Sequence, residues 1–178
     1  LDNLEIFNNT AADHAGGIFV SNHSSPIIKN CDVINNQSSN EGGGITIHNS
    51  QATLEYLNVS LNVSKYGAGI YIANHENPNY NNYITHSNIS NNISEYEGSA
   101  ILLRGGINHL SNLSITNNSC EQTALNCHAI GIESSATITY INQTTISYNY
   151  GYGIKVQQSD ESIITNTIIY SNDYGVNN

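Results

Sequence analysis

Ten asparagines lie in Asn-x-Ser/Thr motifs, the acceptor sequence for N-linked glycans. They are Asn8, Asn22, Asn36, Asn58, Asn62, Asn88, Asn92, Asn112, Asn117 and Asn142. In a secreted protein, an exposed side-chain amide in this motif can receive an oligosaccharide. Asparagine also suits tight corners because it tolerates left-handed backbone conformations, so turn structure alone could explain part of this content.

Three cysteines offer a second kind of chemistry. Cys120 and Cys127 are seven residues apart in a polar stretch, and we predict a disulfide that closes a small loop. Cys31 falls on an apolar position of a repeat, so we interpret it as a small buried hydrophobe.

Glu5 and Asp32 occupy equivalent positions in successive repeats. If the repeats stack, the two carboxylates would lie about 5 Å apart, as in a retaining glycosidase, or could bind Ca²⁺. The same column continues with Asn58, Asn88, Ser114 and Thr145, and we expect no nearby arginine to stabilise a developing anion. A solvated edge is therefore the favoured interpretation of this pair.

The seven histidines predict neither a catalytic triad nor a metal site. His14 and His128 precede predicted corners, and no serine is placed to act with either of them. Histidine spacing also places no two imidazoles on one face. We therefore predict no catalytic residue, no cofactor and no metal ligand.

The elements that position these residues form a repeat of about 22 to 31 residues. One anchor is an asparagine that ends a short apolar-alternating segment: Asn9, Asn36, Asn62, Asn92, Asn118, Asn149 and Asn172. Three residues before it stand Ile6, Val33, Val59, Ile89, Ile115, Ile146 and Ile169. The second anchor is a small-residue corner followed by Ile or Val, as in Gly16-Gly17-Ile18 and Gly43-Gly44-Ile45. Period-two alternation of β-branched residues indicates strands with one buried face.

We predict an all-β fold, a right-handed parallel β-helix solenoid of about seven coils with three short strands per coil. Residues 1–178 form one domain, a segment of a longer or stacked solenoid. A leucine-rich repeat is the structural alternative, because Leu4-x-Ile6-x-x-Asn9 fits its strand signature. The remainder of each repeat has the pattern of a strand and not of a helix, which disfavours a leucine-rich repeat.

Strand alternation also predicts which asparagines face solvent. It sends Asn58, Asn88 and the anchors Asn36, Asn62 and Asn92 outward. The residues one before the anchor, Asn8, Asn35, Asn91 and Asn117, are then expected to form an internal amide ladder. We predict N-glycans at Asn36, Asn58, Asn62, Asn88 and Asn92, and also at Asn22, Asn112 and Asn142.

The recurring Gly-Gly-Ile-x-Val and Asn-x-x-Ile-x-x-Asn patterns resemble the right-handed parallel β-helix repeats of the pectin-lyase-like superfamily, nearest its adhesin and polymorphic outer-membrane-protein-like branch. The resemblance covers nearly the whole chain. It implies the fold and says little of function, since this fold serves lyases, hydrolases, tailspikes, adhesins and structural proteins. The Asn-Thr-Asp, Asp-Asp and Gly-His-Gly motifs that a resemblance to polygalacturonases would require are absent.

Charge limits the expected partners. The net charge is −10 with only four basic residues, so nucleic acid and anionic membrane surfaces are disfavoured. Apolar runs are too short to insert into a membrane. We expect a secreted, extracellular or cell-surface structural module of a fibre, stalk or adhesin, with covalent N-glycans and head-to-tail self-association or continuation of the solenoid as its partnerships. The alternatives are a carbohydrate-active enzyme (polysaccharide lyase or hydrolase) and a sugar-binding adhesin that uses Tyr71, Tyr80 and Tyr83.

Overall fold

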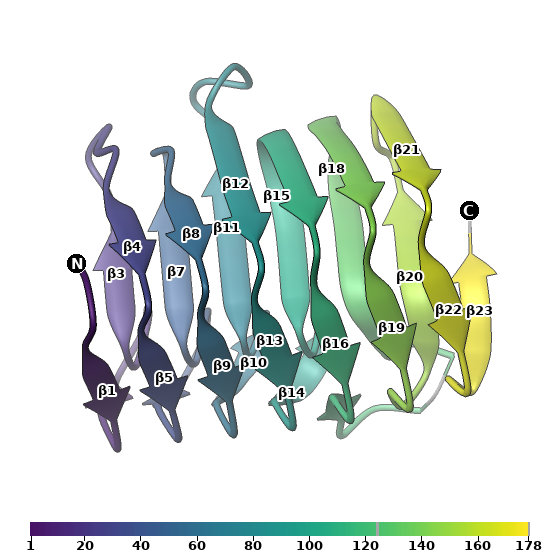
Figure 1. The fold of residues 1–178 in the computed structure, drawn as a ribbon, viewed down its shortest axis with the longest axis horizontal. Coiled ribbons are helices and arrows are strands. Elements are labelled where there is room, and N and C mark those ends of the chain that lie inside the picture. Colours follow the sequence, from purple (N-terminus) through teal and green to yellow (C-terminus); the bar gives the residue numbers. More distant parts are fainter. Residues whose placement is uncertain (124, 178) are drawn as a thin grey trace.

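The computed structural model describes residues 1–123 and 125–177 as a column of parallel β-coils, with no helix in these two ranges (Figure 1). Seven coils follow one another along the column, and the purple N-terminal coil and the yellow C-terminal coil lie at opposite ends. Each inner coil pairs with the coils before and after it, and the two end coils pair on one side. The predicted all-β solenoid is confirmed. A leucine-rich repeat would have helices between its strands, and the described residues contain none. The described residues include no helix able to cross a lipid bilayer.

The first sheet has one strand from every coil. Its strands are β1 (Glu5–Phe7), β5 (Asp32–Ile34), β9 (Asn58–Ser60), β13 (Asn88–Ser90), β16 (Ser114–Thr116), β19 (Thr145–Ser147) and β22 (Ile168–Tyr170). The predicted column of β-branched residues is in register, for example Ile6 beside Val33 and Val33 beside Val59. These side chains point into the core and are fully buried in the five middle coils.

The second sheet is short and has five strands. They are β2 (Thr10–Ala11), β6 (Gln37–Ser38), β10 (Val63–Tyr66), β14 (Ile93–Glu97) and β17 (Ser119–Cys120). These strands follow the anchor asparagines and were not among the three predicted strands per coil. Their small size explains the omission, since β2, β6 and β17 have two residues each.

The third sheet is the largest, with eleven strands. Along its main path lie β3 (Ile18–Val20), β7 (Ile45–His48), β11 (Ile70–Asn74), β15 (Ile101–Ser111), β18 (His128–Asn142), β20 (Tyr152–Gln157) and β23 (Tyr174–Asn177). The shorter β4 (Ile27–Lys29), β8 (Thr53–Glu55), β12 (Asn81–Thr85) and β21 (Glu161–Thr165) pair beside them. Apolar side chains from all coils meet inside the column in one core cluster.

The anchor asparagines of the five inner coils are buried, which contradicts the orientation predicted for Asn36, Asn62 and Asn92. Asn36, Asn62 and Asn92 are at most 1% exposed, whereas Asn35 and Asn91 are exposed. The residue before each anchor adopts a left-handed conformation, with φ of 55° at Asn35 and 56° at Asn91. This conformation turns the chain through a corner and breaks the two-residue alternation, so the anchor side chain points inward.

The anchors form the internal amide ladder that we had assigned to their neighbours. The ladder consists of Asn9, Asn36, Asn62, Asn92, Asn118, Asn149 and Asn172. At every step the Oδ1 of one asparagine accepts hydrogen bonds from the backbone N–H and the side-chain amide of the asparagine in the preceding coil. We call these seven residues the Asn ladder.

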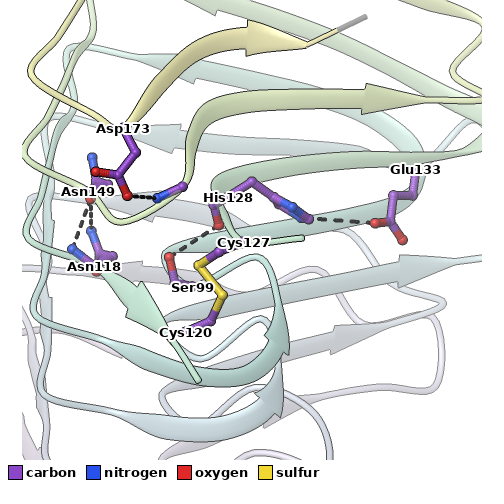
Figure 2. The surroundings of a disulfide bond; sticks show 9 residues. Ser99, Asn118, Cys120, Cys127, His128, Glu133, Asn149 and Asp173 are labelled. Atoms are coloured by element: carbon purple, nitrogen blue, oxygen red, sulfur yellow. Dashed lines mark hydrogen bonds and ion pairs between the residues drawn. A yellow bond between two sulfur atoms is a disulfide. The ribbon is translucent and has the colours of Figure 1, made fainter. Parts of the chain in front are cut away.

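Cys120 and Cys127 form the predicted disulfide, with their Cα atoms 5.8 Å apart (Figure 2). The bond closes the insertion between β17 and β18; residue 124 of this insertion lies outside the described ranges. Cys31 is buried and free, as interpreted from the sequence, and its Sγ donates a hydrogen bond to the Lys29 carbonyl at 3.0 Å.

Candidate metal centre and surrounding surfaces

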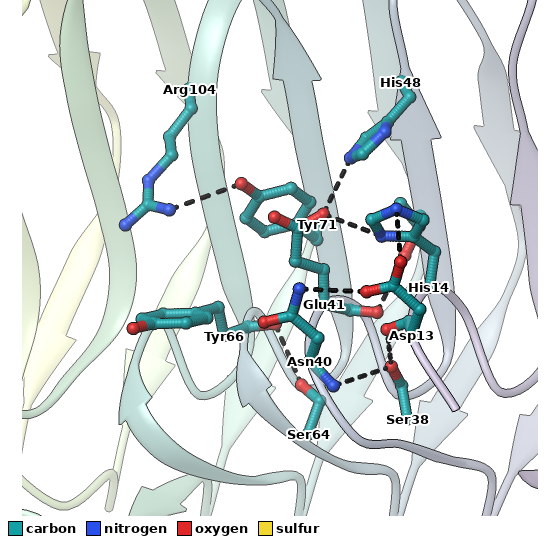
Figure 3. A network of polar contacts seen from close by, with 11 residues as sticks. Asp13, His14, Ser38, Asn40, Glu41, His48, Ser64, Tyr66, Tyr71 and Arg104 are labelled. Atoms are coloured by element: carbon teal, nitrogen blue, oxygen red, sulfur yellow. Dashed lines mark hydrogen bonds and ion pairs between the residues drawn. The ribbon is translucent and has the colours of Figure 1, made fainter. Parts of the chain in front are cut away.

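A polar cluster lies on the outer face of the third sheet, where the first two coils meet (Figure 3). His14 and Glu41 occupy the corners before β3 and β7, and a parallel bridge pairs these two residues. His48 ends β7 and points back toward the same corner. Stacking of equivalent corners therefore brings together residues that are 34 positions apart in the chain.

Glu41 is the centre of this cluster. Its Oε2 lies 3.0 Å from Nδ1 of His14 and 2.8 Å from Nε2 of His48. The two imidazole centroids are 4.6 Å apart. All three side chains are partly buried, with exposed fractions of 30% for His14, 17% for Glu41 and 25% for His48. Partial burial by itself would raise the pKa of the Glu41 carboxyl, but His48, Tyr71 and His14 together hold that pKa below its ordinary value.

Donor atoms of His14, Glu41 and His48 all lie within 4.8 Å of one another. Within residues 1–123 and 125–177, this is the one group of three or more His, Cys, Asp or Glu side chains arranged to hold a metal ion. The expectation that no two histidines share a face is therefore wrong. Spacing along a strand does not reveal this cluster, because His14 and Glu41 come from two corners and His48 from the end of a strand.

A charged group continues the same face toward later coils. Arg104 donates hydrogen bonds to Glu133 at 2.9 Å and to Glu97 at 3.0 Å, and contacts the Tyr71 hydroxyl at 3.3 Å. Its guanidinium also lies 5.3 Å from the centre of the Tyr66 ring. Burial is the largest influence raising the pKa of Tyr71 to about 12, and burial together with neighbouring Glu133 raises the pKa of Glu97.

Tyrosines that we considered as sugar-stacking platforms differ in their surroundings. Tyr71 is 2% exposed and cannot offer a ring face to a ligand. Tyr83 is exposed, but its ring stacks on His109 at 4.6 Å. Tyr80 lies beside His23, with ring centroids 6.1 Å apart. The three tyrosines do not form one platform, since β11 places Tyr71 on a different part of the third sheet from Tyr83 in β12.

Glu5 and Asp32 are paired across β1 and β5, as the repeat predicted. Both contribute to a shallow hollow that is also lined by Phe7, Ile34 and Leu61. Asp32 accepts a hydrogen bond from the Asn58 amide at 3.0 Å. The hollow thus combines two adjacent carboxylates with apolar side chains.

The predicted glycan acceptors fall into two groups. Asn22, Asn88 and Asn112 are exposed, and Asn58 and Asn142 are partly exposed. Asn36, Asn62 and Asn92 belong to the Asn ladder, and their amide nitrogens already donate to buried acceptors. Because a glycan requires a solvent-accessible amide, we withdraw these three positions.

The positions of the corners within the repeat predict part of this polar cluster. His14 and Glu41 each stand two residues before the first glycine of their anchor, so stacked corners must place them side by side. The chain matches no protein-family model, no curated protein and no solved structure in comparisons with known proteins.

Proposed function

We propose that this chain is a secreted structural β-helix module of an extracellular or cell-surface fibre, stalk or adhesin. The observation that carries the proposal is the Asn ladder, which spans all seven coils. Its paired hydrogen bonds tie each coil to the next, and in the inner coils they run between buried side chains. Buried and fully bonded amides favour one fixed stacking register, which suits a stiff spacer.

Its exposed asparagines are proposed to carry N-glycans. Asn88 lies on the outer side of β13, in register with Asn58 of β9. Asn22 and Asn112 are exposed in turns outside the strands. The disulfide between Cys120 and Cys127 supports an oxidising compartment such as the secretory pathway.

Resemblance of the repeat to the adhesin and polymorphic outer-membrane-protein-like branch of the pectin-lyase-like superfamily supports the same role. Unpaired strand edges support a role in assembly. β1 and β3 at one end, and β22 and β23 at the other, each pair on one side only within the described chain. Unpaired edges invite a further strand, so we propose that the column is extended by continuation of the solenoid or by head-to-tail self-association.

Mass spectrometry of protein secreted from eukaryotic cells tests the glycan proposal. We expect enzymatic deglycosylation to remove several kilodaltons, with sugar mapped to Asn22, Asn88 and Asn112. Asn88→Gln should remove one glycan, whereas Asn36 should carry none. An unchanged mass after deglycosylation would contradict a glycosylated module. Electron microscopy of the same material tests head-to-tail stacking, which discrete monomers would exclude.

The carboxylate pair favours one alternative, a carbohydrate-active enzyme. Glu5 and Asp32 are direct neighbours across β1 and β5, a spacing compatible with two-carboxylate glycoside hydrolysis. Release of reducing ends or unsaturated uronates from acidic polysaccharides would support it, provided that Glu5→Gln abolishes release and Glu55→Gln does not. Absence of release across such substrates favours the structural role.

A further inference from the structure

We propose that His14, Glu41 and His48 bind a zinc ion and leave one coordination position open to solvent. Nδ1 of His14, Oε2 of Glu41 and Nε2 of His48 lie within 4.8 Å of one another at the junction of the first two coils (Figure 3). Two imidazoles and one carboxylate are a ligand set that zinc accepts, and three protein ligands leave a place for water.

The distances from the Glu41 carboxylate to the two histidine nitrogens are close to those of a tetrahedral ion. Zinc bonds of about 2.0 to 2.1 Å place neighbouring ligands of a tetrahedron roughly 3.3 Å apart. Glu41 Oε2 lies 3.0 Å from His14 Nδ1 and 2.8 Å from His48 Nε2. Shifts of a few tenths of an ångström would bring each of these two pairs to ligand distance, and the donor nitrogens of His14 and His48 lie within 4.8 Å of each other.

Asp13 lies beside the ring nitrogen of His14 that does not face Glu41. Its Oδ2 is 3.2 Å from Nε2 of His14, and a proton on Nε2 would leave Nδ1 free to bind a metal ion. A carboxylate behind a coordinating histidine is the usual outer partner of such ligands. Phe19 stacks on the His14 ring with a 17° angle between the planes and limits its rotation.

Nδ1 of His14 is left without a hydrogen-bond partner. It is buried, and the atom opposite it at 3.0 Å is the carboxylate oxygen Oε2 of Glu41. A cation between the two atoms would bind both of them. Two nitrogen donors favour zinc or a similar transition metal over Ca²⁺ and Mg²⁺, which prefer oxygen ligands.

An ion at this position would link the first coil to the second, since His14 belongs to one coil and Glu41 and His48 to the next. Because zinc would bind the folded chain and not the unfolded chain, it should stabilise the fold. At a hundredfold excess over Kd, we expect zinc to raise the melting temperature by roughly 5 to 10 °C.

Calorimetric titration of tag-free, chelator-treated protein with ZnCl₂ tests the site directly. We expect one zinc per chain, with no comparable heat from CaCl₂ or MgCl₂. His14→Gln and His48→Gln should each weaken binding at least tenfold, and Asp13→Asn should weaken it about tenfold through its positioning role. His75→Gln is the matched control, because His75 is exposed and lies outside the cluster. This variant should bind zinc with the affinity of the wild type.

Histidine ring NMR signals of the wild-type protein provide a test that needs no variant. Of the seven histidines, only His14 and His48 should shift on adding zinc. Circular dichroism confirms that each variant remains folded. Three results would each overturn the proposal. They are a wild-type protein that does not bind one zinc per chain, zinc-induced shifts at other histidines, and unchanged zinc affinity in folded His14→Gln and His48→Gln.

Discussion

Asn62 accepts two hydrogen bonds from Asn36, one from its backbone N–H at 2.9 Å and one from its side-chain amide at 3.2 Å. The Asn62 amide in turn donates to the Val33 carbonyl at 2.9 Å and to Asn92 at 3.0 Å. One side chain therefore satisfies polar groups in the coils on both sides. Asn62→Ala would leave several of these groups buried without a partner.

We expect Asn62→Ala to lower the free energy of unfolding by about 3 to 5 kcal/mol, because unsatisfied buried groups add to the lost bonds. Urea denaturation of unglycosylated protein measures the effect. Asn88→Ala is the control: Asn88 is exposed, and its loss should cost about 0.5 kcal/mol or less. Equal costs for the two variants would mean that the Asn ladder has no special weight in stability.

The stacking of the coils could be predicted from the sequence because parallel register repeats one residue type down each column. Ile6, Val33 and Val59 share one apolar column, and the structure places them in one register. The disulfide was also predictable, since Cys120 and Cys127 are close in sequence within an insertion. In these cases, local pattern and tertiary position agree.

Corners were where prediction failed. Strand alternation holds only while the backbone stays extended, and the left-handed residue before each ladder asparagine reverses it. A signal was nevertheless present: asparagine occupies the anchor in all seven coils, whereas the preceding position also holds Leu61, Tyr148 and Ser171. The hydrogen bonds of the Asn ladder explain why every anchor position is asparagine. Solvent exposure explains why the position before the anchor varies.

Corner glycines are expected to be intolerant of side chains in the inner coils. A Cβ added to Gly44 would lie 2.6 Å from the Gly69 carbonyl oxygen, whereas one added to Gly175, the equivalent position in the last coil, would meet nothing within 4 Å. We expect Gly44→Ala to cost about 1 to 3 kcal/mol through overpacking, and Gly175→Ala to have little effect. Thermal denaturation of the two variants measures the difference. A tolerant Gly44→Ala would show that the coils can separate locally at no cost.

The disulfide is expected to stabilise the insertion before β18. Closing a loop of this length should contribute about 2 to 3 kcal/mol by restricting the unfolded chain. Cys120→Ser combined with Cys127→Ser should lose this amount in urea denaturation. Mild reduction of the wild type should reproduce the loss, because Cys31 is already free. A double variant as stable as the wild type would indicate that the insertion is ordered by its other contacts.

His128 makes the column sensitive to acid. Its side chain is fully buried at the start of β18, and neither ring nitrogen has a hydrogen-bond partner. The nearest carboxylate oxygen, Oε1 of Glu133, is 4.0 Å from Nε2 (Figure 2). Burial, with smaller contributions from Lys155 and Arg104, lowers the pKa of His128 to about 3. The folded chain therefore holds a neutral imidazole where the unfolded chain would bind a proton.

Because the pKa of His128 is lower in the folded state, its contribution to stability is complete above about pH 6.5 and declines as the pH falls toward 3. Between pH 7 and pH 5.5 we expect a loss of about 1 kcal/mol from this residue alone. His128→Leu should abolish that part of the slope without lowering stability at pH 7, since an apolar side chain leaves no polar atom unsatisfied. Urea denaturation of both proteins across this range provides the measurement. Identical slopes would mean that His128 is protonated or hydrated in the folded chain.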